Sequence, residues 1–389
     1  MIFRGARAGF CCLLAAGVIA GCSTPPGGGS SLPSDMPVRP VAQPWSTLDT
    51  PTLRRNIAQL LPAGVKDRAG WAADLHAAFL HLKLPQEPPL YCAVIAVVEQ
   101  ESTFQADPVV PGLPAIVWRE LEERGGKYGV PRLLIEAAML KTSPDGRSYK
   151  QRVDSVRTEK EVSDIYEDMI AEIPFGKRLL TGYNPVHTGG PMQVSVDFAE
   201  QHTRDQPYPY PIPRTLRDEV FTRRGGLYFG TAILLDYPVP YDDVVYRFAD
   251  FNAGRFSSRN AAFQQAVGRL SGKPLASDGD LLRYKGGKPA EESSSVEAAL
   301  RSVGGRLGLS SSEIRRDLLL EKTAEFPETP LFKRVFSQAD EDAGQRLPRQ
   351  AMPEIDLKSP KITRKLTTEW FARRVEGRFR TCLGRIGGG

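Results

Sequence analysis

The segment best suited to acid–base chemistry follows a run of nine apolar residues, Leu90 to Val98, and reads Glu99-Gln100-Glu101-Ser102. An apolar run of this length predicts a helix that is buried on all sides. The carboxyl group of Glu101 would then lie at the edge of a dry core, where desolvation favours the neutral, protonated form. A carboxyl group that keeps its proton near neutral pH can act as a general acid. Taken alone, however, the segment fits a solvated structural glutamate at a helix end better.

Two further segments combine glycine with polar side chains. Residues 189–195 read Gly-Gly-Pro-Met-Gln-Val-Ser. Glycine lets the backbone approach a ligand closely, Met192 offers an adaptable apolar surface, and Gln193 offers both a donor and an acceptor. Residues 249–254 read Ala-Asp-Phe-Asn-Ala-Gly. Both segments also have a structural interpretation, as a loop before a helix capped by Ser195 and as a helix that ends at glycine.

Taken in this order, the three segments resemble the lytic transglycosylases and goose-type lysozymes, which cleave the glycan strands of peptidoglycan. The matching residues are Glu101-Ser102-Thr103-Phe104, Gly190-Pro191-Met192-Gln193 and Phe251-Asn252-Ala253-Gly254. In addition, the stretch from Gly226 to Leu235 resembles the glycine-containing helix of that superfamily. The resemblance covers roughly residues 85–110 and 183–270 and suggests a divergent member of the superfamily.

The resemblance implies a mainly α fold with a lysozyme-like (transglycosylase) domain. It implies that Glu101 acts first as catalytic acid and then as base, cleaving the bond between N-acetylmuramic acid (MurNAc) and N-acetylglucosamine (GlcNAc) without a cofactor. The products would be 1,6-anhydro sugars. Assistance by the N-acetyl group of the substrate would explain how one carboxylate suffices where many glycosidases use two. The positions that fall to substrate binding are Ser102, Met192, Gln193, Phe251 and Asn252.

Departures from the superfamily pattern keep other functions open. Phe251 stands where the superfamily has tyrosine, and Pro191 replaces leucine. Residues 105–183 form a long helical insertion, which could form a lid or an extra wall of the groove, or could pack away from it. One alternative is a catalytically inactive lipoprotein that binds peptidoglycan or acts as a scaffold. Another is a lysozyme-type hydrolase, if Asp250 or Asp197 brings a second carboxylate to the groove.

The first 21 residues are typical of a targeting signal rather than of a folded element. A short basic start precedes an apolar block that ends in Ile19-Ala20-Gly21-Cys22, which resembles the lipobox of bacterial lipoproteins. The resemblance implies a signal peptide over 1–21 and lipidation of Cys22. Because Ser23 is not aspartate, it also implies anchoring in the outer membrane, facing the periplasm. An ordinary signal peptide is the alternative. Residues 22–50 contain a stretch rich in Pro, Gly and Ser that predicts a flexible tether.

The five cysteines and four histidines leave little material for a metal site, and we expect none. If the signal is removed and Cys22 is acylated, Cys92 and Cys382 remain. In the oxidising periplasm these two could form a disulfide, or they could be separately buried thiols. A net charge of +5 over 389 residues is too small to indicate nucleic-acid binding. The expected partners are therefore peptidoglycan glycan strands and, through the lipid on Cys22, the membrane.

The chain is long enough for about two domains, and its apolar residues recur mostly at helical spacing. A capping box over Thr158–Glu161 predicts one helix start, and Ser359-Pro360 predicts the start of the last helix. Gly, Pro, Ser and charged residues cluster between positions 273 and 295 and predict a linker there. The expected order is a lysozyme-like domain over 51–272 with the insertion 105–183, a linker over 273–295 and a C-terminal helical domain over 296–389.

Overall fold

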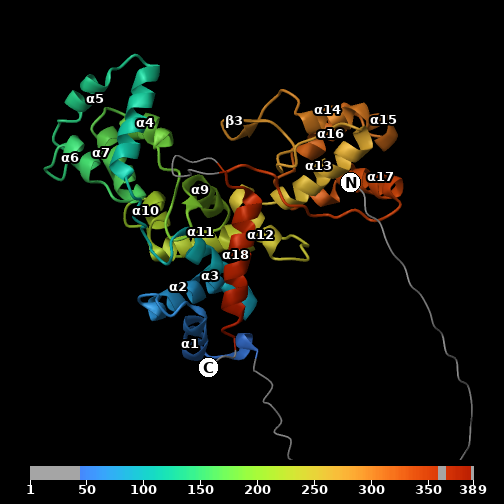
Figure 1. Ribbon diagram of the computed structural model, residues 1–389, viewed down its shortest axis with the longest axis horizontal. Coiled ribbons are helices and arrows are strands. Elements are labelled where there is room, and N and C mark those ends of the chain that lie inside the picture. Colours follow the sequence, from blue (N-terminus) through green and yellow to red (C-terminus); the bar gives the residue numbers. More distant parts are fainter. Residues whose placement is uncertain (1–43, 358–364, 387–389) are drawn as a thin grey trace, which may run out of the picture. The chain divides into compact units, whose positions relative to one another are not determined.

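The computed structural model describes residues 44–357 and 365–386, and these are mainly helical (Figure 1). The mainly α prediction is therefore confirmed. The expected signal peptide, Cys22 and the tether up to residue 43 lie outside the described residues. The end of the expected flexible tether is helical instead, because η1 (Trp45–Thr47) and the start of α1 (Thr50–Leu60) fall within it. Within 44–357 and 365–386, no helix combines the length and the apolar character that a membrane span needs.

The largest hydrophobic core surrounds α3 (Pro88–Glu101). Prolines in its first turn start the helix where no backbone donor is needed. Each side chain from Tyr91 to Val98 is at most 1% exposed, as the apolar run predicts. The helices that bury α3 or extend its core are α1, α2 (Arg68–His81), α9 (Val196–Asp205), α10 (Leu216–Val220), α11 (Arg223–Leu235), α12 (Val245–Ala253) and α18 (Thr368–Leu383). The end of α3 therefore has a position fixed from several sides.

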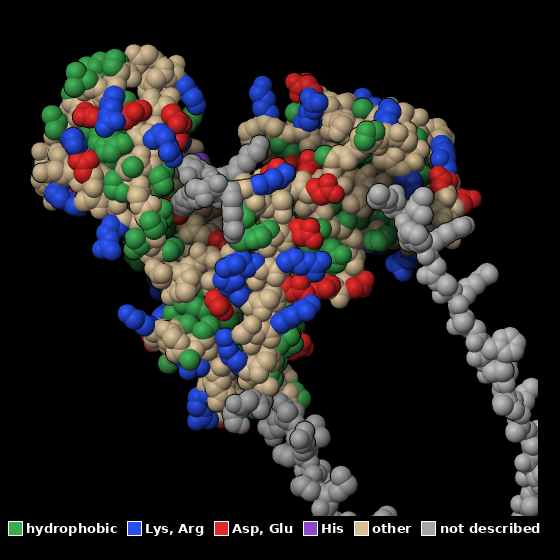
Figure 2. Space-filling view, in the orientation of Figure 1, with side chains coloured by type: hydrophobic (Ala, Val, Ile, Leu, Met, Phe, Trp, Pro, Cys, Tyr) green, Lys and Arg blue, Asp and Glu red, His purple; other side chains and the backbone are tan. Residues whose placement is uncertain are grey.

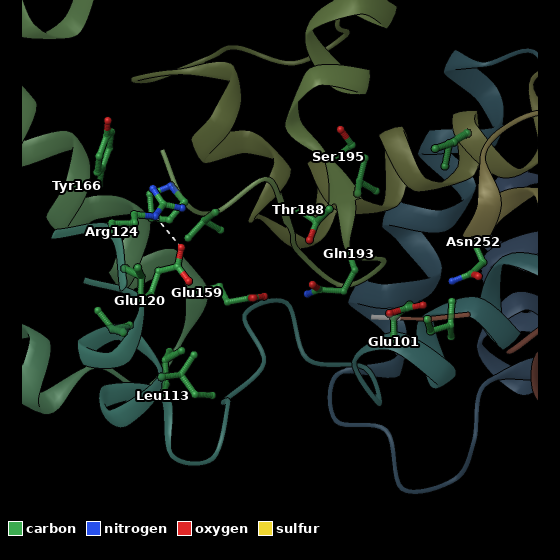
Figure 3. A pocket seen from close by; sticks show the side chains of 18 of the residues that line it. Glu101, Leu113, Glu120, Arg124, Glu159, Tyr166, Thr188, Gln193, Ser195 and Asn252 are labelled. Atoms are coloured by element: carbon green, nitrogen blue, oxygen red, sulfur yellow. Dashed lines mark hydrogen bonds and ion pairs between the residues drawn. The ribbon is translucent and has the colours of Figure 1, made fainter. Parts of the chain in front are cut away.

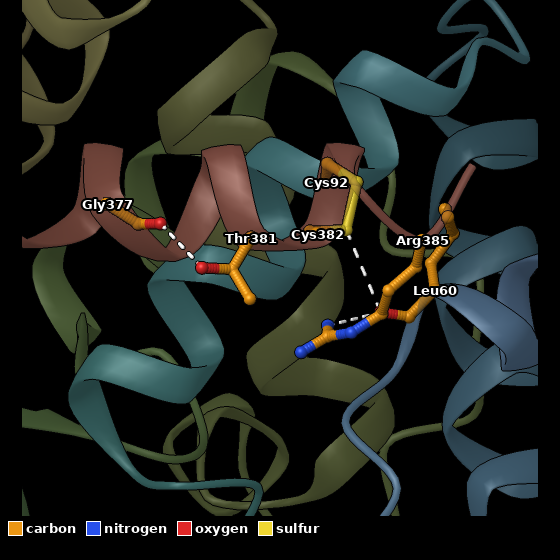
Figure 4. Close-up of a disulfide and its surroundings, with 6 residues drawn as sticks. All are labelled: Leu60, Cys92, Gly377, Thr381, Cys382 and Arg385. Atoms are coloured by element: carbon orange, nitrogen blue, oxygen red, sulfur yellow. Dashed lines mark hydrogen bonds between the residues drawn. A yellow bond between two sulfur atoms is a disulfide. The ribbon is translucent and has the colours of Figure 1, made fainter. Parts of the chain in front are cut away.

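The last helix, α18, belongs to this first core. Its residues Phe371 and Val375 are buried there, and α18 packs against both α3 and α12. A disulfide between Cys92 and Cys382 joins α18 to α3, with 5.5 Å between the Cα atoms (Figure 4). The expected C-terminal domain over 296–389 is thus divided, because the apolar face of α18 and its cysteine find their partners on α3.

The start of the last helix also differs from the expectation. α18 begins at Thr368, whose predecessor Thr367 caps it by accepting a hydrogen bond from the backbone N–H of Trp370 at 3.1 Å. Residues 365–367 are not helical, and residues 358–364 lie outside the described part. The expected opening at Ser359-Pro360 therefore falls in a segment of which the structure says nothing.

A second core forms around α13 (Ser257–Ser271), where Phe263 lies among the rings of Phe326, Phe332 and Phe336. Its other elements are α14 (Ser295–Ser302), α15 (Gly304–Leu307), α16 (Ser311–Leu318), η3 (Phe326–Glu328), α17 (Pro330–Ala343) and the hairpin of β3 (Tyr284–Lys285) with β4 (Lys288–Pro289). The expected boundaries at 272 and 295 do not separate the cores. α13 packs into the second core, and the supposed linker contributes buried Leu281 and Leu282 to it.

The expected insertion forms a lobe with a third core of its own, centred on Trp118, Tyr149 and Ile165. Its helices are α4 (Leu113–Lys127), α5 (Arg132–Ala138), α6 (Tyr149–Ser155), α7 (Glu159–Ala171), α8 (Gly176–Leu180) and η2 (Thr181–Tyr183). The Thr158–Glu161 capping box is present at the start of α7, as predicted. After the lobe, β1 (Thr188–Gly189) pairs antiparallel with β2 (Val194–Ser195) and leads into α9.

Candidate functional site

A pocket of about 940 Å³ lies between the end of α3, the β1–β2 hairpin, α12 and the insertion lobe (Figure 3). Four residues singled out in the sequence line it, namely Glu101, Gln193, Phe251 and Asn252. They come from three distant segments, and all four are partly exposed. In Figure 3 the side chains of Gln193 and Asn252 lie on either side of Glu101. The fold thus gathers the carboxyl group of Glu101 and two carboxamides at one end of a pocket whose lobe wall also carries Glu120 and Glu159.

Glu101 is the last residue of α3, and an abrupt change of the backbone follows it. Ser102 ends the helix, and Thr103 and Phe104 then have positive φ values of 51° and 60°. A β-branched residue such as threonine rarely adopts this region, so surrounding contacts must hold it there. The ring of Phe104 packs edge-on against Trp71 with 5.3 Å between centroids. Strained backbone of this kind collects at functional sites, and here it lies directly after the pocket carboxyl group.

The position of Gln193 depends on two glycines. A Cβ atom on Gly190, whose φ is 74°, would lie 2.1 Å from the carbonyl oxygen of Val220. A Cβ atom on Gly230 of α11 would lie 2.2 Å from the sulfur of Met192. Because both glycines lack a side chain, the loop sits directly against α10 and α11. Gln193 itself has a φ of 50°, and its Nε2 donates to the Gly190 carbonyl at 3.3 Å.

Asn252 lies in the last turn of α12, next to Phe251, and both line the pocket. The Oδ1 atom of Asn252 accepts a hydrogen bond from the hydroxyl of Thr368 at 2.8 Å. Thr368 is fully buried at the first position of α18. The carboxamide is therefore tied to a helix that is distant in sequence. Phe251 offers the pocket a ring without a hydroxyl group, so the polar contact that a tyrosine would make is absent.

Asp250 does not face the pocket, although it immediately precedes two pocket residues. It is fully buried and accepts hydrogen bonds from the hydroxyls of Tyr237 at 3.1 Å and Tyr241 at 2.7 Å. The backbone N–H groups of Phe256 and Ser258 donate to it at 3.0 and 2.6 Å. Burial raises the pKa of Asp250 above its ordinary value, while these donors act in the opposite direction. Its carboxyl group holds the junction of α12 and α13, so the second-carboxylate interpretation is wrong for this residue.

The insertion lobe forms the opposite wall of the pocket. The sequence left open a lid, an extra wall of the groove and a remote packing lobe. Because residues of the lobe line the pocket, the remote packing lobe is wrong. α4 and α7 each present one helical face, with residues three or four positions apart. Arg124 and Glu120 form an ion pair at 2.6 Å on this wall (Figure 3). The lobe residues that line the pocket are Leu113, Ile116, Val117, Glu120, Leu121, Arg124, Glu159, Val162, Tyr166 and Met169.

Three other residues considered for the groove lie elsewhere. Met192 is fully buried, because its side chain fills the space that Gly230 leaves on α11. Ser102 is also buried, and its hydroxyl donates to the Val98 carbonyl one turn earlier at 3.1 Å, so it closes the helix instead of facing a ligand. Asp197 is exposed in the first turn of α9 and does not line the pocket.

Some features of the pocket had weak signals in the sequence or none. Thr188 and Ser195 line it from the hairpin, and Ser195 also caps α9 by accepting from the Phe198 N–H at 3.3 Å. The helical spacing between residues 113 and 124 could have predicted an apolar face, although not what it covers. No local pattern marks Thr368, because only tertiary packing brings it to Asn252. In the part of the chain that the structure describes, no group of three or more His, Cys, Asp or Glu side chains could hold a metal ion.

Comparison with known proteins defines the family. Residues 64–385 match the family DUF1615, described as a protein of unknown function, and the chain belongs to this family. It is similar to a protein of Escherichia coli (strain K12) named "Uncharacterized protein YaiW". The two are 47% identical over 371 residues, which cover 95% of this chain and 96% of that protein. No solved structure matches the chain. The matched range includes the insertion lobe, the second core and α18, so all of them are part of the family's common unit.

Proposed function

We propose that this protein is a lytic transglycosylase that cleaves the MurNAc–GlcNAc glycan strand of peptidoglycan. One observation carries the proposal: Glu101, Gln193 and Asn252 come from three separate segments and line a single pocket of about 940 Å³. That volume is typical of pockets that bind an organic ligand. In this proposal the first core is a lysozyme-like domain, and the buried helix α3 presents the catalytic acid at its end.

In the proposed reaction Glu101 acts twice. It first donates its proton to the glycosidic oxygen, so that the bond to C1 of MurNAc breaks and the next sugar leaves with a hydroxyl group. The acetamido oxygen of MurNAc bonds to C1 and balances the charge that develops there. The carboxylate of Glu101 then removes the proton of the MurNAc 6-hydroxyl, whose oxygen displaces the acetamido oxygen at C1. The product is the 1,6-anhydro sugar, no water is consumed, and Glu101 regains its proton.

The two walls of the pocket suit the two kinds of surface on a sugar ring. Gln193 and Asn252 can hydrogen-bond to hydroxyl and acetamido groups, because a carboxamide has both donors and an acceptor. The aliphatic side chains of Val117, Leu121 and Val162 on the lobe can contact the C–H faces of the rings. Apolar walls with a few placed polar groups are the usual composition of a ligand pocket.

The location that this proposal requires agrees with the start of the chain. We propose that Cys22 is lipidated and anchors the protein in the outer membrane, facing the periplasm, where peptidoglycan lies. The disulfide between Cys92 and Cys382 supports such a location, because disulfides persist in oxidising compartments and are rare in the cytosol.

Phe251 favours a second candidate, a lipoprotein that binds peptidoglycan without cleaving it. The ring lines the pocket next to Asn252 and provides no hydroxyl group near Glu101. If catalysis needs that hydroxyl, the pocket still offers two carboxamides and an apolar wall for binding. The two candidates differ in one measurable respect, since only the enzyme releases soluble fragments from intact peptidoglycan.

The test is Glu101→Gln, which removes the transferable proton and keeps the size of the side chain. The purified chain is incubated with sacculi, and the soluble products are separated and weighed by mass spectrometry. The wild-type protein should release anhydro-muropeptides, and the variant should release none above background. The matched control is Glu99→Gln, since Glu99 lies on the same helix, does not line the pocket and is 3.8 Å from Arg378.

Each outcome has a distinct meaning. Anhydro products from both wild type and Glu101→Gln would refute the role of Glu101. Products one water heavier than the anhydro forms would indicate a lysozyme-type hydrolase. Binding of wild type to sacculi without any soluble product would favour the binding-only candidate.

A further inference from the structure

The carboxamide of Asn252 has only one of its two ends available to a ligand. Its Oδ1 accepts the Thr368 hydroxyl at 2.8 Å, from the side of α18. The oxygen and nitrogen of a carboxamide point in different directions, so fixing one end fixes the other. In Figure 3 the nitrogen of Asn252 is the end turned toward Glu101, in the pocket. An NH₂ group has two donors and no acceptor.

The buried position of Thr368 makes this orientation stable. Thr368 is fully buried, and its backbone N–H donates to the carbonyl of Ile355 at 3.0 Å. The helix it starts is tied to α3 by the Cys92–Cys382 disulfide. A second link lies close to the disulfide, just beyond the end of α18, where the guanidinium of Arg385 donates to the Leu60 carbonyl at 2.7 Å (Figure 4). The backbone that carries the hydroxyl is therefore held in place, and the burial of Thr368 leaves its side chain little room to turn away from Asn252.

We infer that Thr368 is a positioning residue that holds the NH₂ group of Asn252 toward the pocket. The site then selects a ligand that places a carbonyl oxygen at this NH₂ group, and the acetamido group of an N-acetylated sugar supplies such an oxygen. The inference deepens the proposed function and rests on it for the kind of ligand. Among the groups of such a glycan, the acetamido carbonyl is a stronger acceptor than the hydroxyls. A site built to hydrogen-bond one group rejects a ligand that lacks it, because its own polar atom is then left without a partner.

The test compares two probes, the GlcNAc tetramer and the same tetramer without its acetyl groups. Affinities of the full chain for each are measured by calorimetry, and the ratio of the two affinities is the readout. Using the ratio removes effects that alter both probes equally, such as a loss of folded protein. The wild-type chain should prefer the acetylated probe.

Asn252→Asp decides the direction of the amide. The substitution keeps the shape, lets Thr368 donate to one oxygen and turns an acceptor instead of a donor toward the pocket. It should lower the affinity for the acetylated probe, which carries no charge, because the donor to the acetamido carbonyl is replaced by an acceptor that repels it. If instead Oδ1 faces the ligand, the aspartate preserves that acceptor and the affinity for the acetylated probe stays at the wild-type value.

Thr368→Val decides whether the hydroxyl does the positioning. It should lower the preference for the acetylated probe by about three- to tenfold, the range expected for one neutral hydrogen bond. Thr368→Ser keeps the hydroxyl and should restore the preference. The matched control is Thr381→Val on the exposed face of the same helix, where the hydroxyl bonds only to the Gly377 carbonyl at 3.0 Å (Figure 4). It should behave as wild type.

Several results would overturn the inference. They are an unchanged affinity of Asn252→Asp for the acetylated probe, an unchanged preference in Thr368→Val, a wild-type chain that binds both probes equally, and a wild-type chain that binds neither. Failure of the proposed function looks different. If only the proposed function fails, the chain prefers the acetylated probe as expected, but sacculi release no anhydro-muropeptides. If only the inference fails, the chain cleaves sacculi but shows no preference between the probes.

Discussion

Removal of the Cys92–Cys382 disulfide should destabilise the first core strongly. The two cysteines are 290 residues apart, so the bond closes a very long loop in the unfolded chain. For that length the loop-entropy relation gives about 5.7 kcal/mol at 25 °C. Measured values are typically about 2–4 kcal/mol and reach about 5. We therefore expect Cys92→Ala/Cys382→Ala to lose about 3–5 kcal/mol of unfolding free energy.

Guanidinium denaturation followed by tryptophan fluorescence measures this loss. Trp71 and Trp370 lie in or against the first core and Trp118 lies in the lobe, whereas the second core contains no tryptophan among its described residues. The fluorescence transition therefore reports on the part of the molecule that the disulfide closes. Reduction of the wild-type protein should lower the midpoint in the same way as the double substitution.

Two controls separate the disulfide from side effects of the substitutions. Reductant should not alter the double variant, and Thr381→Ala, on the exposed face of α18, should change stability by less than about 0.5 kcal/mol. Equal unfolding free energies for the oxidised, the reduced and the doubly substituted protein would refute the reasoning. Packing of α18 against α3 and α12 would then hold the helix without help from the bond.

Three further predictions follow from single side chains. Gly230→Ala places a methyl group 2.2 Å from the Met192 sulfur, so it should cost about 1–3 kcal/mol of unfolding free energy and reduce glycan release. The control Gly126→Ala, with open space around its Cβ, should do neither. Thermal melts and the sacculus assay measure both effects, and an unperturbed Gly230→Ala would contradict the close packing. Asp250→Asn replaces a carboxylate that accepts four hydrogen bonds by a carboxamide that must also donate. It should cost about 2–4 kcal/mol of unfolding free energy, measured by chemical denaturation. An unchanged free energy would contradict the role of Asp250 at the α12–α13 junction. Burial raises the pKa of Glu321 from 4.5 to about 7. At a pH between these two values, Glu321 is therefore protonated in the folded protein and ionised in the unfolded chain. The unfolding free energy should therefore fall by about 2–4 kcal/mol as pH rises through this window, and by less in Glu321→Gln. Chemical denaturation at pH 5 and pH 8 tests this. An equal fall in the wild type and in Glu321→Gln would contradict it.

Local features of the chain were predictable because neighbouring residues decide them. The all-round burial of α3 follows from an uninterrupted apolar run, and the capping box at Thr158–Glu161 starts α7 where the sequence indicates. The sequence also singled out Glu101, Gln193 and Asn252, each beside a helix end or a glycine turn. Their presence in one pocket agrees with the order of the motifs.

Spacing along the chain could not decide which partner a side chain finds. Met192 and Asp250 lie next to pocket residues in the sequence, yet Met192 fills the space at Gly230 and Asp250 turns to two tyrosines and two backbone amides. A one-residue step around a helix or a turn directs a side chain to another face. For such residues the packing of distant segments determines the direction.

The sequence by itself determined the helical class, the buried helix that ends in Glu101, several helix caps and the residue types that reach the pocket. These depend on hydrophobic periodicity and on hydrogen bonds within a few residues. Only the tertiary structure decided the division into three cores, the return of α18 to α3, the role of the insertion as a pocket wall and the hydrogen bond from Thr368 to Asn252. These depend on contacts between segments up to 325 residues apart, whose free energy is not encoded in any local pattern.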